Sequence, residues 1–101
     1  MPLAIETDRE RLAEFCRKWR VKELSIFGSA LRGDFGPDSD VDVLVELEED
    51  PPWDAFDWVD MTDALRDIFG RDVDLVDKAA IRNPFRRHNI LRTRQVIYAA
   101  R

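Results

Sequence analysis

Two carboxylates separated by a single residue are the feature of this sequence most suggestive of chemistry. Asp40 and Asp42 flank Val41 at the start of an apolar run that ends at Leu47. Successive side chains of a strand alternate between its faces, so we expect both acids on one side. Like charges at this spacing repel each other, and a bound cation would offset the repulsion. Mg²⁺ fits best, because it favours a few carboxylates together with substrate phosphates.

A Gly-Ser pair stands upstream of these acids, at the end of the preceding apolar run. Ten residues separate Gly28-Ser29 from Asp40. A glycine lets the backbone approach a phosphate closely, and a serine hydroxyl can donate to a phosphate oxygen. We therefore predict that this pair holds the triphosphate of a nucleotide. An ordinary strand-to-helix turn with a serine cap is the alternative.

A metal site of this kind needs a third oxygen ligand, which we expect from the apolar run at residues 71–77. Asp72 and Asp74 share one face of that strand by alternation, whereas Asp77 would need a bulge to join them. Asp40 and Asp42 could also have purely structural roles. Asp40 could be a turn or capping acid, and Asp42 could face solvent on an edge strand.

Gly28-Ser29, Arg32-Gly33 and the run Ser39-Asp40-Val41-Asp42 together resemble the minimal nucleotidyltransferases, the small members of the DNA polymerase beta-like nucleotidyltransferase superfamily. The resemblance covers nearly the whole chain. It implies that the third acid lies in a Val-Asp-Leu context, which selects Asp74. It also implies that Asp40, Asp42 and Asp74 are catalytic and hold two Mg²⁺ ions, with ATP as the substrate.

Two further polar residues of the motif are candidates for nucleotide binding. Arg32 could contact nucleotide phosphates, or it could pair with the nearby Asp34 or Asp38. Ser39 could bind the nucleotide, or it could serve as the turn residue that positions Asp40. The predicted nucleotide-binding set is therefore Gly28, Ser29, Arg32 and Ser39.

Hydrophobic periodicity and turn residues predict the elements that position these groups. Helical spacing of apolar residues indicates helices over residues 8–20, 53–69 and 85–94, and alternation indicates strands over 21–27, 40–47 and 72–76. Residues 96–98 are expected to form a small strand or an extended tail. We expect one α/β domain spanning residues 1–101. Its predicted fold is the polymerase beta-like nucleotidyltransferase fold, a small mixed β-sheet with helices packed on one face.

Composition narrows the classes of protein further. The chain has 101 residues and a net charge of −5, which argues against direct nucleic-acid binding. It has neither an apolar run long enough to span a bilayer nor the apolar region of a signal peptide, so we expect a cytoplasmic protein without a membrane partner. Cys16 is the only cysteine and falls at an apolar helical position, so we expect it to be buried.

The segment around the single histidine is basic. His88 is accompanied by Arg86, Arg87, Arg92 and Arg94. A lone histidine on a polar helix is usually solvated and seldom catalytic. The arginines could form a contact face for an acidic partner or for nucleotide phosphates, or they could remain a solvated face.

The resemblance also implies a biological role. Stand-alone minimal nucleotidyltransferases resemble the antitoxins of toxin–antitoxin pairs whose toxin is a HEPN-family ribonuclease. The expected activity is transfer of AMP from ATP to a tyrosine of that toxin. A protein that neutralises its partner by complex formation alone, with a vestigial site, is the alternative.

Overall fold

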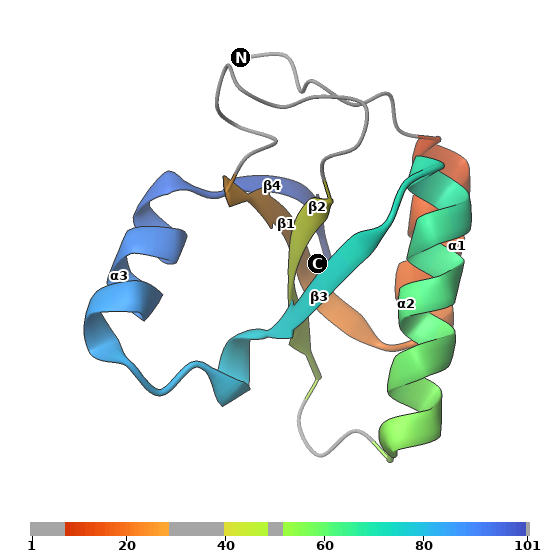
Figure 1. Cartoon of the computed structure of the whole chain (residues 1–101). Helices are drawn as coiled ribbons and strands as arrows, with labels where there is room; N and C mark the ends of the chain where they lie inside the picture. The colour runs from red at the N-terminus through yellow and green to blue at the C-terminus, as the bar shows by residue number, and fades with distance from the viewer. Residues whose placement is uncertain (1–7, 29–39, 49–51, 101) are drawn as a thin grey trace.

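The computed structural model describes residues 8–28, 40–48 and 52–100, and Figure 1 shows the arrangement of their elements. Within these residues, four strands form one sheet in the order β3-β2-β1-β4, and three α-helices accompany it. The elements in chain order are α1 (Arg9–Lys18), β1 (Val21–Phe27), β2 (Val41–Leu47), α2 (Ala55–Phe69), β3 (Val73–Asp77), the 3₁₀ turn η2 (Lys78–Ala80), α3 (Pro84–Thr93) and β4 (Gln95–Ala99). The predicted mixed α/β architecture is confirmed.

Local capping signals account for where the helices begin and end. Asp8 caps α1 by accepting from the amides of the first turn, and Asn83 does the same for α3, which starts at Pro84. Asp54 and Asp57 form a capping box at the start of α2. Gly70 ends α2 with φ of 69°, a left-handed conformation that favours glycine.

Strand pairing makes the sheet mixed. β1 pairs antiparallel with both β2 and β4, whereas β2 pairs parallel with β3. The parallel pair requires a crossover, and α2 supplies it between β2 and β3. β1 and β2 are therefore the two central strands, and β2 lies between β1 and β3.

The larger hydrophobic core lies between the sheet and the helices α1 and α2. Side chains at alternate positions of β1 and β2 enter it and are fully buried, among them Leu24, Ile26, Val43 and Val45. Cys16 of α1 belongs to this core, as predicted, and so does Trp19, while Trp53 and Trp58 pack against it. The amphipathic pattern of both helices is thereby explained.

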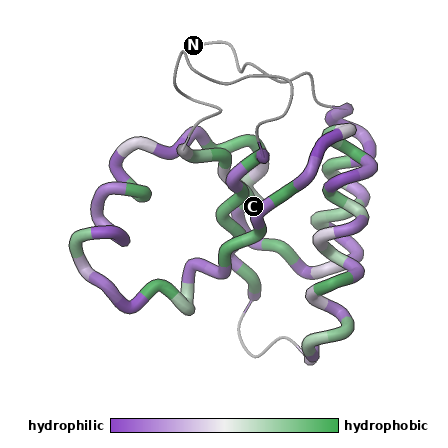
Figure 2. Tube along the Cα trace, viewed as in Figure 1, coloured by the Kyte–Doolittle hydropathy of each residue, from purple (hydrophilic) through white to green (hydrophobic). Residues whose placement is uncertain are grey.

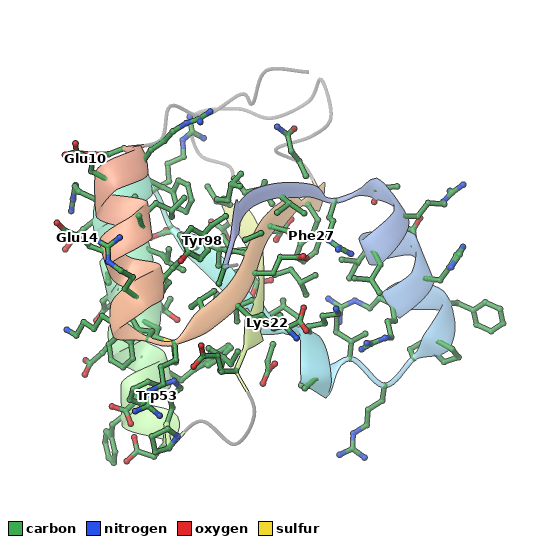
Figure 3. The ribbon with its side chains drawn as sticks, turned by 180° about the vertical axis from the view of Figure 1, so that it is seen from behind. Glu10, Glu14, Lys22, Phe27, Trp53 and Tyr98 are labelled. Atoms are coloured by element: carbon green, nitrogen blue, oxygen red, sulfur yellow. The ribbon has the colours of Figure 1, made fainter. Side chains whose placement is uncertain are left out.

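A smaller core occupies the other face of the sheet. Phe27 and Leu44 pack there with Ile81 and with Ile90 of α3. Figures 1 and 3 show α3 on the opposite side of the strands from α1 and α2, with Phe27 on the α3 side. The predicted packing of helices on one face thus describes α1 and α2, whereas α3 covers the apolar residues that the second face exposes.

Two glutamates face each other across the central strands, at the end of the sheet away from Phe27. Glu23 of β1 and Glu46 of β2 are Cα partners. Arg94 lies 2.8 Å from Glu23, and Lys78 lies 3.0 Å from Glu46. These two cations offset the repulsion between the glutamates and tie the C-terminal segment to the sheet.

None of the helices in the described part of the chain is long and apolar enough to cross a membrane.

Candidate active site

Two of the predicted catalytic acids meet where β1 ends and where β2 and β3 begin. Asp42 of β2 is the Cα partner of Asp74 on the parallel strand β3, and on its other side it is the partner of Phe27. In-register neighbours on adjacent strands project from the same face. The structure therefore brings Asp42 and Asp74 together, although 31 residues of chain lie between them.

Both acids lie on the face of the sheet that α3 accompanies. Asp42 alternates along β2 with Val41 and Val43, which are buried in the core beneath α1 and α2. Its side chain therefore lies on the opposite face of the sheet, together with that of Leu44. Asp74 alternates with Val73 and Leu75 in the same way and takes the face of Val76. Asp42 is half-buried and Asp74 is exposed.

Gly28 immediately follows β1 and contacts Asp42. It has φ of 70°, and a Cβ built on it would overlap the Asp42 carboxylate, lying 3.1 Å from its Cγ. We predicted from the sequence that the missing Cβ makes room for a triphosphate. In the structure it makes room for the carboxylate of Asp42, so a larger residue at this position would displace one of the proposed catalytic groups.

The remaining predicted residues are only partly described. Asp40 directly precedes β2 and is exposed, one residue outside the strand in which we expected it. The amide of Val41 donates to the carbonyl of Asp72 at 2.9 Å, which anchors the start of β2 to the residue before β3. Ser29, Arg32 and Ser39 lie outside the described residues.

The structure gives the competing acids other partners. Asp72 precedes β3 and forms an ion pair with Arg66 of α2 at 3.0 Å. Asp77 ends β3, and its carboxylate accepts from the amide of Ala79 at 3.0 Å, so it caps η2. Arg66 was not singled out from the sequence, although it stands one turn before the Gly70 cap and so can reach back to the following strand.

Asp72 and Arg66 also border a surface hollow of about 660 Å³ at the end of α2. Its other lining residues are Asp63, Asp67, Gly70 and Arg71. Charges of both signs line the hollow, and it shares no residue with the Asp42 and Asp74 pair.

The acids have the right chemistry for Mg²⁺ but not a complete arrangement. Within the described ranges, no group of three or more Asp, Glu, His or Cys side chains is arranged to hold a metal ion. The donor chemistry does fit, because carboxylate oxygens are the ligands that Mg²⁺ prefers and Asp42 and Asp74 are neighbours in the sheet. The described side chains thus supply suitable donors without forming a complete ligand set.

Comparison with known proteins identifies the family to which this sequence is similar. A profile of the nucleotidyltransferase domain matches residues 9–97. A candidate protein adenylyltransferase of Methanocaldococcus jannaschii is 42% identical over 73 residues, which is 72% of either chain. The protein adenylyltransferase MntA of Thermococcus cleftensis is 37% identical over 70 residues, which is 69% of either chain.

Solved structures agree on the fold. A toxin–antitoxin crystal structure with AMP-PNP has a TM-score of 0.71 at 18% identity and covers 93% of this chain and 75% of that one. A complex of a tri-AMPylated Shewanella oneidensis HEPN toxin with its MNT antitoxin has a TM-score of 0.63 at 16% identity, covering 91% and 70%. The profile and the sequence relatives together show that the chain belongs to the nucleotidyltransferase domain family.

Proposed function

We propose that this protein transfers AMP from ATP to a tyrosine hydroxyl of a HEPN-family ribonuclease toxin, and that it acts in this way as an antitoxin. The observation that carries the proposal is the pairing of Asp42 with Asp74 beside Gly28, in a chain of the nucleotidyltransferase domain family. Relatives described as protein adenylyltransferases support the reaction. The structural neighbours described with AMP-PNP and with an AMPylated HEPN toxin support the nucleotide and the acceptor.

The proposed roles follow from the chemistry of the residues. Asp40, Asp42 and Asp74 would hold two Mg²⁺ ions, which would neutralise phosphate charge and orient the reacting oxygens. Gly28, Ser29, Arg32 and Ser39 hold the triphosphate. The acceptor oxygen attacks the α-phosphorus in line, forming a new P–O bond while the bond to the pyrophosphate oxygen breaks. Asp74, the more exposed acid, accepts the proton of the attacking hydroxyl.

The test is transfer of label from α-labelled ATP to the cognate HEPN-family protein, with and without Mg²⁺. We expect the Asp40→Asn, Asp42→Asn double variant to lose transfer by orders of magnitude, because the amides keep the shape of the acids but remove the charge that binds metal. Transfer at the normal rate by this variant would show that the site is assigned wrongly. A wild-type protein that binds and silences its partner without transferring AMP would instead favour neutralisation by complex formation.

A further inference from the structure

The basic charge of the chain is concentrated in its C-terminal quarter. Seven of the 16 Lys and Arg residues lie between Lys78 and Arg101, and that segment contains no Asp or Glu, although the whole chain has a net charge of −5. Figure 2 shows hydrophilic residues along much of α3. The segment from Lys78 to Arg101, which contains α3, therefore carries a charge opposite to that of the rest of the chain.

Only some of these cations are used within the fold. Lys78 and Arg94 form ion pairs with the sheet, and Arg87 donates to the carbonyl of Lys78 at 2.8 Å. Arg86 and Arg92 are exposed, and their side chains have no ion pair or hydrogen bond with any other residue that the structure describes. Their charge is therefore available to a partner.

A large apolar side chain lies among these free cations. Phe85 is 85% exposed, and Arg86, His88, Asn89 and Arg92 are also exposed, while Ile90 on the opposite side of the helix is buried. We call Phe85, Arg86, His88, Asn89 and Arg92 the α3 face. An exposed aromatic ring flanked by arginines is the composition typical of residues that dominate binding energy at protein interfaces.

The position of the α3 face relates it to the proposed active site. α3 lies on the same side of the sheet as Asp42 and Asp74, and its last residues lead into β4, whose Gln95 is the Cα partner of Ile26 near the end of β1. Phe56, which is 82% exposed, belongs to α2 on the opposite side. Arg92 lies in the last turn of α3, at the end that leads into β4 and toward the acids, whereas Phe85 lies in the first turn, at the other end. A protein that covers the α3 face from Phe85 to Arg92 would therefore extend toward the acids.

We propose that the α3 face is where the acceptor protein docks, through an acidic surface that includes an apolar pocket for Phe85. This inference rests on the proposed function, because transfer to a protein hydroxyl requires the acceptor to lie next to Asp42 and Asp74. Charge complementarity selects an acidic partner surface, and long-range attraction speeds its approach. The occupant is the same protein that receives AMP.

Two exposed phenylalanines on opposite sides of the molecule provide a matched test. Binding of the cognate HEPN-family protein is measured by calorimetry for Phe85→Ala and for Phe56→Ala, with thermal unfolding as the control for folding. We expect Phe85→Ala to weaken binding about tenfold or more and Phe56→Ala to change it by less than about twofold. Equal effects, or a larger effect of Phe56→Ala, would overturn the proposal.

Charge reversal tests the electrostatic part. The Arg86→Glu, Arg92→Glu variant should bind more weakly and lose most of the salt dependence of association, whereas Arg17→Glu on α1 should do neither. A short single-stranded RNA serves as the second probe. If the double variant loses RNA binding but still forms the protein complex, the α3 face binds nucleic acid and the proposal is wrong.

The outcome is separable from that of the proposed function. A wild-type protein that transfers AMP while Phe85→Ala binds its acceptor normally would refute the docking surface alone. A wild-type protein that binds through the α3 face without transferring AMP would refute the catalytic proposal alone. In transfer assays Phe85→Ala should raise the concentration of the HEPN-family protein that gives half-maximal transfer, whereas Phe56→Ala should not.

Discussion

The Cα of Gly28 lies against the carboxylate of Asp42, so closely that a Cβ on Gly28 would overlap that group. Gly28 directly follows β1 and Asp42 lies in β2, where it pairs with Asp74 of β3. The Asp42 carboxylate can therefore occupy its position only because residue 28 has no side chain. Its φ of 70° adds a second requirement, because other residues adopt that conformation at a cost.

Gly28→Ala should therefore reduce AMP transfer by about 100-fold or more, since misplacing a catalytic group by an ångström costs that much. Gly70→Ala is the matched control, because Gly70 has φ of 69° but nothing within 4 Å of an added Cβ. Both variants should lower the melting temperature. Only Gly28→Ala should also lose AMP transfer at temperatures where the protein is still folded. Equal activity of the two variants would show that the contact with Asp42 is unimportant.

Among the acids of the third strand, Asp74 should complete the site. We expect Asp74→Asn to abolish Mg²⁺-dependent transfer, because Asp74 is the in-register partner of Asp42. Asp72→Asn should lose only its ion pair with Arg66, and Asp77→Asn retains an oxygen that can cap η2. Initial rates of label transfer provide the ranking. Loss of transfer in Asp72→Asn with normal transfer in Asp74→Asn would reverse the assignment.

The capping box of α2 should contribute to stability in a pH-dependent way. The amide of Asp57 donates to the Asp54 carboxylate at 2.9 Å, and this bond is the main reason that the pKa of Asp54 lies below its usual 3.8. A lowered folded-state pKa means that the contribution is complete above pH 3.8 and is lost as the pH falls through the folded-state value. Melting temperatures of the wild type and Asp54→Ala should therefore differ at neutral pH and converge in strong acid.

Cys16 should be inert in the folded protein. Burial raises the pKa of its thiol from 9.0 to about 12, against a smaller opposite effect of Arg17. A disulfide reagent that detects free thiols should react with Cys16 at mildly alkaline pH only after the chain is unfolded. Because the folded-state pKa is raised, this group's contribution to stability is complete below pH 9.0 and falls as the pH rises toward 12. Rapid labelling of the native protein would contradict the burial.

The ion pair between Arg94 and Glu23 should hold the C-terminal segment on the sheet. Its side chains are only 19% and 25% exposed, and Glu23 faces Glu46 across the strands. Arg94→Met should lower the free energy of unfolding by about 1–2 kcal/mol, more than a surface pair costs, because it leaves two glutamates opposed. Adding Glu23→Gln should restore part of the loss. Arg92→Met, at an exposed position, is the control and should stay within about 0.5 kcal/mol.

The local elements, and the strand face on which a side chain lies, could be predicted from residue patterns alone. Helical spacing and the caps at Asp8, Gly70 and Asn83 predict the helices to within a few residues, because these signals act between residues close in the chain. Alternation likewise predicts that Asp42 and Leu44 share a face opposite Val43. The Val-Asp-Leu context selected Asp74 only through family resemblance.

Local patterns do not predict which distant residues come into contact. Alternation cannot say which strands are neighbours or in what register, so only the fold pairs Asp42 with Asp74 and Gly28 with Asp42. Contacts between distant segments also pair Asp72 with Arg66 and place α3 on the face of the sheet opposite α1 and α2. Such contacts form because apolar residues on both faces of the central strands have to be covered, and that requirement belongs to the whole chain.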